Sequence, residues 1–467
     1  MTASGIVIGI DLGTTTAKAI AVDVTGRIVA TAQAPTRWDV GPSGEVQTPV
    51  DRMADDAISV LAEAAAAVPD SMVAAIGITG LAETGVVVDA RGQARTPAIA
   101  WYDQRGQDEL RALPAAEQAA FSAATGLACK AECSWSKLLW LHAHGLRIEP
   151  GDVWLNALEY VAFRLTGALA TEPSLASRTG LLNQATCGPL DWTLDRFGAG
   201  PDFLPAQVLA GTSIGVARGS VPTRLLGAKV TVAGHDHLVG SVGAGATGGD
   251  DLYNSCGTAD VVLRTVPRTL RDDERAQLVA SGLSAGRHVL PGTTAMLGAT
   301  RSGLVLGRVL TMLGAVDREA RRAIADRWQP GSHNPAITVD EVPGWTNEVT
   351  IHLRDEGTPQ DIWGAAMDYV LGQTADLLGE FESIAGPYQQ AIAAGGWARL
   401  DGVFRGKATL MPGLRRSDVD EAGAHGAAVF ARQTLDGPST TSPAGAQTGQ
   451  AHPSDPTNAH VMEDAPA

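Results

Sequence analysis

Short apolar runs separated by polar turns dominate the start of the chain and predict strands. Residues 5–35 contain three such runs, which is typical of a strand meander. An alanine-rich stretch predicts a helix over residues 49–68, and the apolar run 73–79 predicts a buried strand. Residues 86–89 are predicted to pair antiparallel with that strand, and residues 98–101 to form a further edge.

The strand pattern of the N-terminus restarts in the second half of the chain. Residues 230–233 predict a strand and residues 238–246 a helix, and residues 252–263 then repeat the opening order of strand, Gly-Thr turn and strand. Two halves that begin alike predict an internal structural duplication, although their sequences share little. The other predicted elements are helices within residues 104–165, loops over 183–228, a strand with a Gly-Gly turn over 391–397 and a helix over 421–433.

The turn between the first two predicted strands carries the most informative chemistry. Gly13, Thr14 and Thr15 offer N–H groups and hydroxyls in a concave turn, an arrangement that binds phosphate oxygens. A carboxylate at Asp11 would repel phosphates unless a cation lay between them, and Mg²⁺ prefers carboxylate, water and phosphate ligands. The pair therefore predicts a Mg-nucleotide site, although an ordinary hairpin turn is the alternative. No Walker P-loop pattern opens a helix here.

Composition narrows the class of protein. A chain of 467 residues with 45% hydrophobic residues fits two domains. The formal net charge of −16 argues against nucleic acid and anionic membranes as partners. No apolar run is long enough to span a membrane and no signal peptide is apparent, so we expect a soluble, cytoplasmic protein. The four cysteines lack the spacing of a zinc site, and we interpret them as reduced thiols.

Five segments in a fixed order resemble the FGGY carbohydrate kinases over about residues 5–435. They are the Asp11 hairpin, residues 101–105, residues 234–236, residues 256–258 and residues 394–396. The resemblance implies an α/β fold of two actin-like (ribonuclease H-like) domains, with ATP and a sugar or polyol meeting in the interdomain cleft. The implied domains are residues 1–240 and 241–435. Residues 436–467 are poor in large apolar side chains and are predicted to be a disordered tail.

The resemblance also implies roles for single residues. Asp236 follows a predicted buried strand and precedes a predicted helix, and it matches the aspartate that accepts the proton of the phosphorylated hydroxyl; from the local sequence alone an N-cap role is equally compatible. Asp11 would hold Mg²⁺ through water, and Lys18 is either a phosphate ligand or a solvated lysine. The nucleotide contacts would fall on glycines and threonines of three turns: Gly13, Thr14, Thr15, Gly257, Thr258, Gly395 and Gly396.

The predicted acceptor pocket departs from the better-known relatives. Ala82 stands where glycerol kinases have a substrate-binding arginine, and only the neighbouring Glu83 remains. Trp101 matches a residue that packs on the carbon skeleton of the substrate, and Trp135 is expected to reshape the rim of the pocket. Glu83, Glu132, His235 and His237 form a candidate pocket for hydroxyl groups, with surface carboxylates and a buried histidine as the alternative. Because no arginine is obvious, an acidic sugar is disfavoured. The segment 171–179 matches the family more for structure than for chemistry.

The sequence thus predicts ATP-dependent phosphorylation of a hydroxyl, expected to be primary, of a neutral ketose or polyol. Asp236 would act as base, and a homodimer is a possible assembly. A catalytically silent sensor of the same fold is the alternative, which the intact Asp11, Gly-Thr turns and Asp236 disfavour. A chaperone-like or filament-forming actin relative is disfavoured by residues 101–105.

Overall fold

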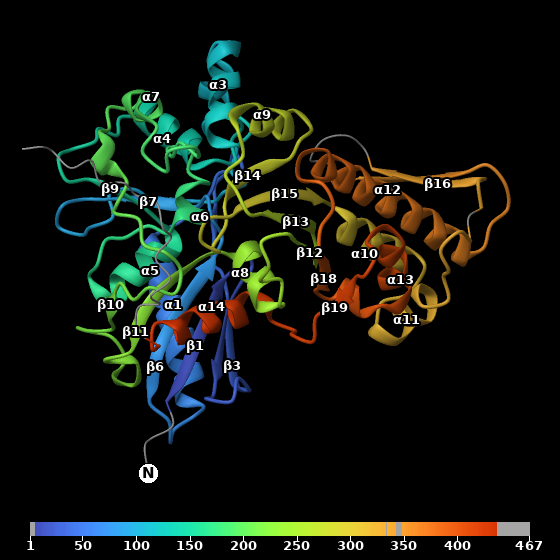
Figure 1. Ribbon diagram of the computed structural model, residues 1–467, viewed down its shortest axis with the longest axis horizontal. Helices are drawn as coiled ribbons and strands as arrows, with labels where there is room; N and C mark the ends of the chain where they lie inside the picture. The colour runs from blue at the N-terminus through green and yellow to red at the C-terminus, as the bar shows by residue number, and fades with distance from the viewer. Residues whose placement is uncertain (1–4, 333, 342–347, 437–467) are drawn as a thin grey trace, which may run out of the picture.

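Two six-stranded sheets form the centre of the protein in the computed structural model, which describes residues 5–332, 334–341 and 348–436 (Figure 1). The first sheet has the order β10 (Gly215–Val216), β11 (Lys229–His235), β6 (Val73–Gly80), β1 (Ile6–Leu12), β2 (Thr16–Val22) and β3 (Ile28–Pro35). The second has the order β14 (Ser284–Arg287), β15 (Thr294–Thr300), β13 (Asp260–Val266), β12 (Asp251–Cys256), β18 (Gln390–Ala394) and β19 (Arg415–Arg416).

The two sheets share one topology, which confirms the predicted duplication. In the first sheet β1, β2 and β3 form an antiparallel meander, and β6 and then β11 continue it in parallel on the other side of β1. In the second sheet β12, β13 and β15 form the meander, and β18 and β19 continue it in parallel beyond β12. The central strand β1 is buried on both faces, which accounts for its unbroken apolar run before Asp11.

Helices surround both sheets. Those of the first half are α1 (Val50–Ala66), α2 (Gln107–Arg111), α3 (Ala115–Thr125), α4 (Ser134–Ala143), α5 (Ala157–Thr166), α6 (Pro173–Ala176), α7 (Asp191–Asp195) and α8 (Asp236–Gly243). Those that follow are α9 (Asp272–Ala280), α10 (Ser302–Met312), α11 (Arg318–Ala325), α12 (Pro359–Ala385), α13 (Asp401–Leu410) and α14 (Ala422–Gln433), with short 3₁₀ turns η1 (Pro201–Phe203), η2 (Thr223–Leu225) and η3 (Trp397–Arg399). None of the helices in the described part of the chain is both long and apolar enough to cross a membrane.

The last helix, α14, returns to the first half and packs on its sheet beside α8 (Figure 1). Its alanines join Val7 of β1 and Ala75 of β6 in one apolar cluster. The approach is close: a Cβ atom on Gly9 or Gly77 would lie 2.0 Å or 1.9 Å from a carbonyl oxygen of α14. The division of the chain at residue 240 therefore stays a prediction, since a helix from the second predicted domain completes the core of the first.

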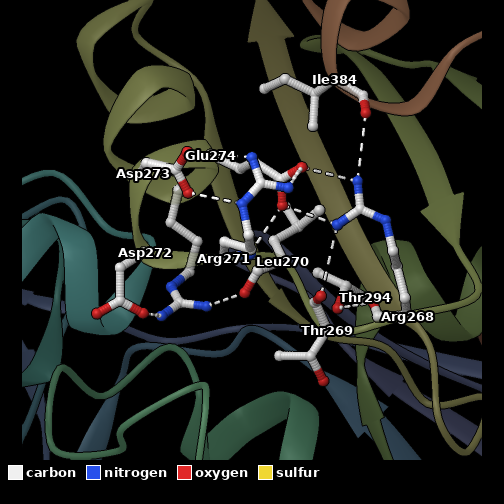
Figure 2. A network of polar contacts seen from close by, with 10 residues as sticks. Arg268, Thr269, Leu270, Arg271, Asp272, Asp273, Glu274, Thr294 and Ile384 are labelled. Atoms are coloured by element: carbon white, nitrogen blue, oxygen red, sulfur yellow. Dashed lines mark hydrogen bonds and ion pairs between the residues drawn. The ribbon is translucent and has the colours of Figure 1, made fainter.

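A second connection between the halves joins α3 to α9 and the edge strand β14. Arg275 of α9 is buried, and its Nε donates to the carbonyl of Ala123 at 2.6 Å. At the start of α9, the Glu274 carboxylate accepts hydrogen bonds from Arg268 at 2.7 and 2.8 Å and from the Arg271 side chain at 2.9 Å (Figure 2). This ion-pair network fixes the first turn of α9 where it meets the first half.

Three smaller sheets complete the fold, and one of them corrects a prediction. Strand β7 (Gly85–Val88) pairs antiparallel with β9 (Val153–Asn156) and not with β6. The remaining strands are β4 (Asp39–Val40), β5 (Val46–Thr48) and β8 (Ala98–Ile99) in one sheet and β16 (Ile337–Glu341) and β17 (Val349–Leu353) in another. All but the first residue of the predicted tail 436–467 lies outside the described residues. All four cysteines are free.

Candidate active site

The first Gly-Thr turn joins β1 to β2, as predicted, and its carbonyl groups are already engaged. Thr36 donates its side-chain hydroxyl to Gly13 O at 2.7 Å and its N–H to Thr15 O at 2.9 Å, and Trp38 Nε1 donates to Thr14 O at 2.8 Å. In the described part of the chain no hydrogen bond uses the N–H of Thr14 or Thr15. The turn therefore keeps its donors for a ligand, as an anion-binding nest requires.

Asp11 lies at the end of β1, against the N-terminal turn of α14. Its Oδ1 atom is buried and has no hydrogen-bond partner among the described residues. The pKa of Asp11 is raised to about 7, first by burial and then by the carboxylates of Asp236 and Glu421, against the opposing effect of Lys18. No three His, Cys, Asp or Glu side chains of the described chain gather closely enough to hold a metal ion by themselves, but a buried carboxylate oxygen without a donor fits a divalent cation. One carboxylate with water and phosphate oxygens is the ligand set that Mg²⁺ uses.

Lys18 is engaged elsewhere. Its Nζ atom forms an ion pair with Glu421 Oε1 at 2.8 Å, just before α14. The structure thus assigns Lys18 a partner within the protein.

Asp236 is the first residue of α8 and follows β11 directly. His235, not Asp236, occupies the N-cap position, so the alternative of an N-cap aspartate is not realised. Asp236 Oδ1 accepts the His237 N–H at 2.6 Å and lies 3.2 Å from His235 Nε2. Strands β1 and β11 flank β6, with Asp11 opposite Thr79 and His235 opposite Gly80, so the predicted magnesium ligand and the predicted base lie at the same end of the sheet.

Glu83 has an arginine partner that sequence reasoning missed. Arg178, from the loop after α6, donates Nε to Glu83 Oε1 at 2.7 Å, and its Nη2 lies 2.6 Å from the same oxygen. Its Nη1 donates to Ser284 Oγ of β14 at 3.0 Å, so the pair also touches the second half. This corrects the expectation that the pocket lacks an arginine. The only signal for it in the sequence was the match of segment 171–179 to the family, which indicated structure and not chemistry.

The Glu83–Arg178 pair lies in the same group as the histidines. Burial lowers the pKa of His235 to about 4. The charges around the ring also affect this pKa: Asp236 and Glu83 raise it, and Arg178 and His237 lower it. His237 is about one-third exposed, with Nε2 3.9 Å from Asp236 Oδ1. The predicted acceptor residues Glu83, His235 and His237 are therefore brought together around Asp236.

The other predicted pocket residues are placed differently. Trp101 is partly buried and donates Nε1 to Thr14 Oγ1 at 3.1 Å, which connects it to the phosphate turn. Trp135 is fully buried and stacks on Phe121 with ring centroids 4.9 Å apart, so the prediction that it shapes the rim is wrong. Glu132 lies half-buried before α4, where its carboxylate raises the pKa of Lys137 against the opposing effect of burial.

The second Gly-Thr turn opens into a cavity of about 990 Å³ in the second half of the protein. Gly257, Thr258 and Gly396 line it, together with residues of α10, α11 and η3. Gly395 packs against the same turn, since a Cβ atom there would lie 2.5 Å from Cys256 O. The lining contains no carboxylate and five arginines, Arg308, Arg318, Arg321, Arg322 and Arg399. Such a lining suits a polyanion.

The first Gly-Thr turn does not line the large cavity. Asp11, Thr14 and Thr15 are absent from the lining of the large cavity, and Gly13 lines a separate small pocket beside α1. Tyr253 of β12 connects the second half to the two carboxylates of the first. Burial raises the pKa of its hydroxyl, and Asp236 and Asp11 act in the same direction. Strand β12 of the second half thus faces the two carboxylates of the first.

A duplicated fold with a Gly-Thr turn in each half and two carboxylates at one end of the first sheet is the arrangement expected of a nucleotide-dependent phosphotransferase. The model of the N-terminal domain of the FGGY family of carbohydrate kinases matches residues 6–243, just over half of the chain. A glycerol kinase from Allorhizobium ampelinum is 30% identical over 395 residues, which cover 80% of this chain and 78% of that protein. The chain therefore belongs to the FGGY family of carbohydrate kinases.

Solved structures agree on the fold. A xylulose kinase from Rhodospirillum rubrum superposes with a TM-score of 0.78 at 22% identity, covering 91% of this chain and 90% of that one. The Plasmodium falciparum glycerol kinase with ADP superposes with a TM-score of 0.80 at 17% identity, covering 93% of this chain and 90% of that one. At these identities the likeness establishes the two-domain actin-like architecture alone.

Proposed function

We propose that the protein transfers the γ-phosphoryl group of ATP to a primary hydroxyl of a neutral ketose or polyol. Asp236 is the general base, and Mg²⁺ is held at Asp11. The observation that carries the proposal is the placement of Asp236 and Asp11 at the same end of the first sheet, with one carboxylate at a helix start and the other at a phosphate-type turn.

The donor side rests on the two turns. The free N–H groups of Thr14 and Thr15 suit phosphate oxygens, and the arginine-lined cavity beside Gly257 and Thr258 suits the remainder of the nucleotide. When bound at Asp11, Mg²⁺ neutralises phosphate charge. Because the first turn lies outside the large cavity, we propose that the halves close on the nucleotide before transfer, which also excludes water.

The transfer requires Asp236 to accept one proton. As the acceptor oxygen forms its bond to the γ-phosphorus, the bond between that phosphorus and the bridging oxygen of ADP breaks, and the hydroxyl proton passes to Asp236. Asp236 Oδ1 accepts the His237 N–H and lies 3.2 Å from His235 Nε2, whereas no hydrogen bond of the described chain uses Oδ2. Oδ2 is therefore the oxygen assigned to this role.

The acceptor side rests on the Glu83–Arg178 pair. A carboxylate that accepts and a guanidinium that donates lie within 2.7 Å of each other, and together they complement two neighbouring hydroxyl groups. Glu83 balances the charge of Arg178, which favours a neutral acceptor over an acidic one. The relatives include a glycerol kinase and a xylulose kinase, so the acceptor of this protein has to be identified by experiment.

The test is the Asp236→Asn variant assayed for ADP release with a panel of pentuloses, hexuloses, tetritols, pentitols and glycerol. We expect the best acceptor to lose at least about 100-fold in kcat, with the Kd for ATP changed less than about 2-fold. Wild-type turnover in the variant would refute the role of Asp236. If the wild type releases no ADP with any acceptor while it binds ATP, the silent sensor is the better description.

A further inference from the structure

His235 makes a contact that the transfer reaction does not by itself require. Its Nε2 lies 3.2 Å from Asp236 Oδ1, the same oxygen that accepts the His237 N–H at 2.6 Å. The peptide N–H of His237 and the imidazole Nε2 of His235 therefore both lie on one oxygen of the carboxylate. Since a carboxylate turns about a single bond, fixing Oδ1 also fixes the direction of Oδ2.

The histidine is buried and uncharged. Its side chain is about one-twelfth exposed, at 8%, and Nδ1 has no partner in the described part of the chain. The charged or titratable groups that face it are Asp236, Glu83, Arg178 and His237 from the first half and His288 from the second. With the ring neutral and Nε2 facing a carboxylate, the proton belongs on Nε2, which makes His235 a hydrogen-bond donor without a positive charge.

The backbone that carries this histidine is held by a buried polar chain. The His235 N–H donates to Ser174 Oγ at 3.0 Å, and Ser174 Oγ in turn donates to the Glu172 carboxylate. Thr79 Oγ1 of β6 donates to Gly234 O at 2.6 Å. The end of β11 that carries the ring is thus held by α6 through Ser174 and by β6 through Thr79, and such support is what orientation of a neighbouring group demands.

We infer that His235 is a positioning residue for the general base: its neutral Nε2–H holds Asp236 Oδ1 so that Oδ2 points at the acceptor hydroxyl. The inference rests on the proposed function, in which Asp236 takes the proton. A neutral donor orients the carboxylate without the full charge of a lysine or arginine, which would weaken its affinity for a proton.

The test compares His235→Ala with His235→Gln in the ADP-release assay. Removing the donor should lower kcat roughly 100-fold, the effect of a displacement of about 1 Å at a reacting group, while KM for ATP stays within about 2-fold. Glutamine keeps an N–H donor on a side chain of similar length and should recover most of the lost kcat. His425→Ala serves as a control, because His425 contacts the opposite end of α8 through Gly243 O and should change kcat less than about 2-fold.

A double-mutant cycle separates positioning from folding. In an Asp236→Asn background, His235→Ala should cause almost no further loss of kcat, because no carboxylate remains to be oriented. Full additivity of the two losses, or a folded His235→Gln variant as inactive as His235→Ala, would overturn the inference. If Asp236→Asn itself keeps wild-type turnover, the proposed function fails first; if Asp236→Asn is inactive and His235→Ala is normal, only the role of His235 fails.

Discussion

Replacing Gly423 by alanine should damage the active site without unfolding the protein. Gly423 is the second residue of α14, and a Cβ atom there would lie 2.2 Å from Asp11 Oδ2 and 3.0 Å from its carboxyl carbon. Because real Cβ atoms essentially never come nearer than 3.0 Å, the carboxylate must withdraw by close to 1 Å or the helix must move. The side chain of Asp11 is the softer of the two, so we expect the carboxylate to turn away from the phosphate-type turn.

The magnitude follows from that displacement. A shift of about 1 Å at a group proposed to hold the metal corresponds to roughly a 100-fold loss in kcat/KM for MgATP. Alanine is the better helix former by up to about 1 kcal/mol, so the thermal midpoint should not fall by more than a few degrees. The expected signature is therefore a stable protein that needs a higher concentration of free Mg²⁺ for half-maximal activity.

The assay is ADP release as a function of free Mg²⁺ at saturating acceptor, with thermal unfolding measured on the same samples. Gly379→Ala is the matched control, because Gly379 is a helical glycine of α12 and an added Cβ atom would meet nothing within 4 Å. It should keep wild-type activity and Mg²⁺ dependence. An active Gly423→Ala with an unchanged Mg²⁺ requirement would show that Asp11 does not hold the metal from its present position.

Three further predictions test other parts of the molecule. Burial raises the pKa of Glu172 to about 8 from 4.5, so the folded protein keeps a proton that the unfolded chain has released; this contribution to the free energy of unfolding is complete below pH 4.5 and lost as pH rises through about 8. This contribution amounts to at most about 5 kcal/mol. Glu172→Gln should therefore flatten the fall of the thermal midpoint between pH 5 and pH 8. An unchanged slope would contradict the raised pKa of Glu172. Arg178→Lys should raise the KM for the acceptor at least about 10-fold with little change in the KM for ATP, since lysine cannot contact Glu83 and Ser284 together; equal effects on both substrates would refute a role in acceptor binding. Arg308→Ala should raise the KM for ATP about 2- to 5-fold, with a smaller effect in high salt, while Arg27→Ala at a distant exposed turn should not; no change for Arg308 would exclude its contact with the nucleotide.

The features that could be predicted from the sequence are those whose signal lies within a short stretch of the chain. The strand–turn–strand units around Gly13 and Gly257 are continuous in sequence, and the structure has them as predicted. The placement of Asp236 after a buried strand and at the start of a helix was equally readable, because strand, glycine and helix follow one another directly.

The features that were missed depend on distant partners. Arg178 lies 95 positions from Glu83, and no periodicity in the chain indicates that the two meet. The pairing of β7 with β9 has the same cause, because pairing of distant strands is decided by the tertiary fold. Trp135 did carry a signal: it precedes the apolar pair Leu138 and Leu139 in a helix, a pattern typical of a core residue, and its rim position was inferred from relatives instead.

The return of α14 to the first sheet has a consequence for biosynthesis. A ribosome makes residues 422–433 after almost everything else the structure describes, yet β1, β6 and α8 bury their apolar surfaces against that helix. Nascent chains must therefore carry an incomplete first half until α14 emerges, and this surface is where chaperones would bind. A chain ending at residue 421 should be more sensitive to proteolysis within residues 5–243 than the full chain, and equal sensitivity would contradict this dependence. Because Gly423 also lies against Asp11, the carboxylate proposed to bind magnesium is held in place only when synthesis of the chain is nearly complete.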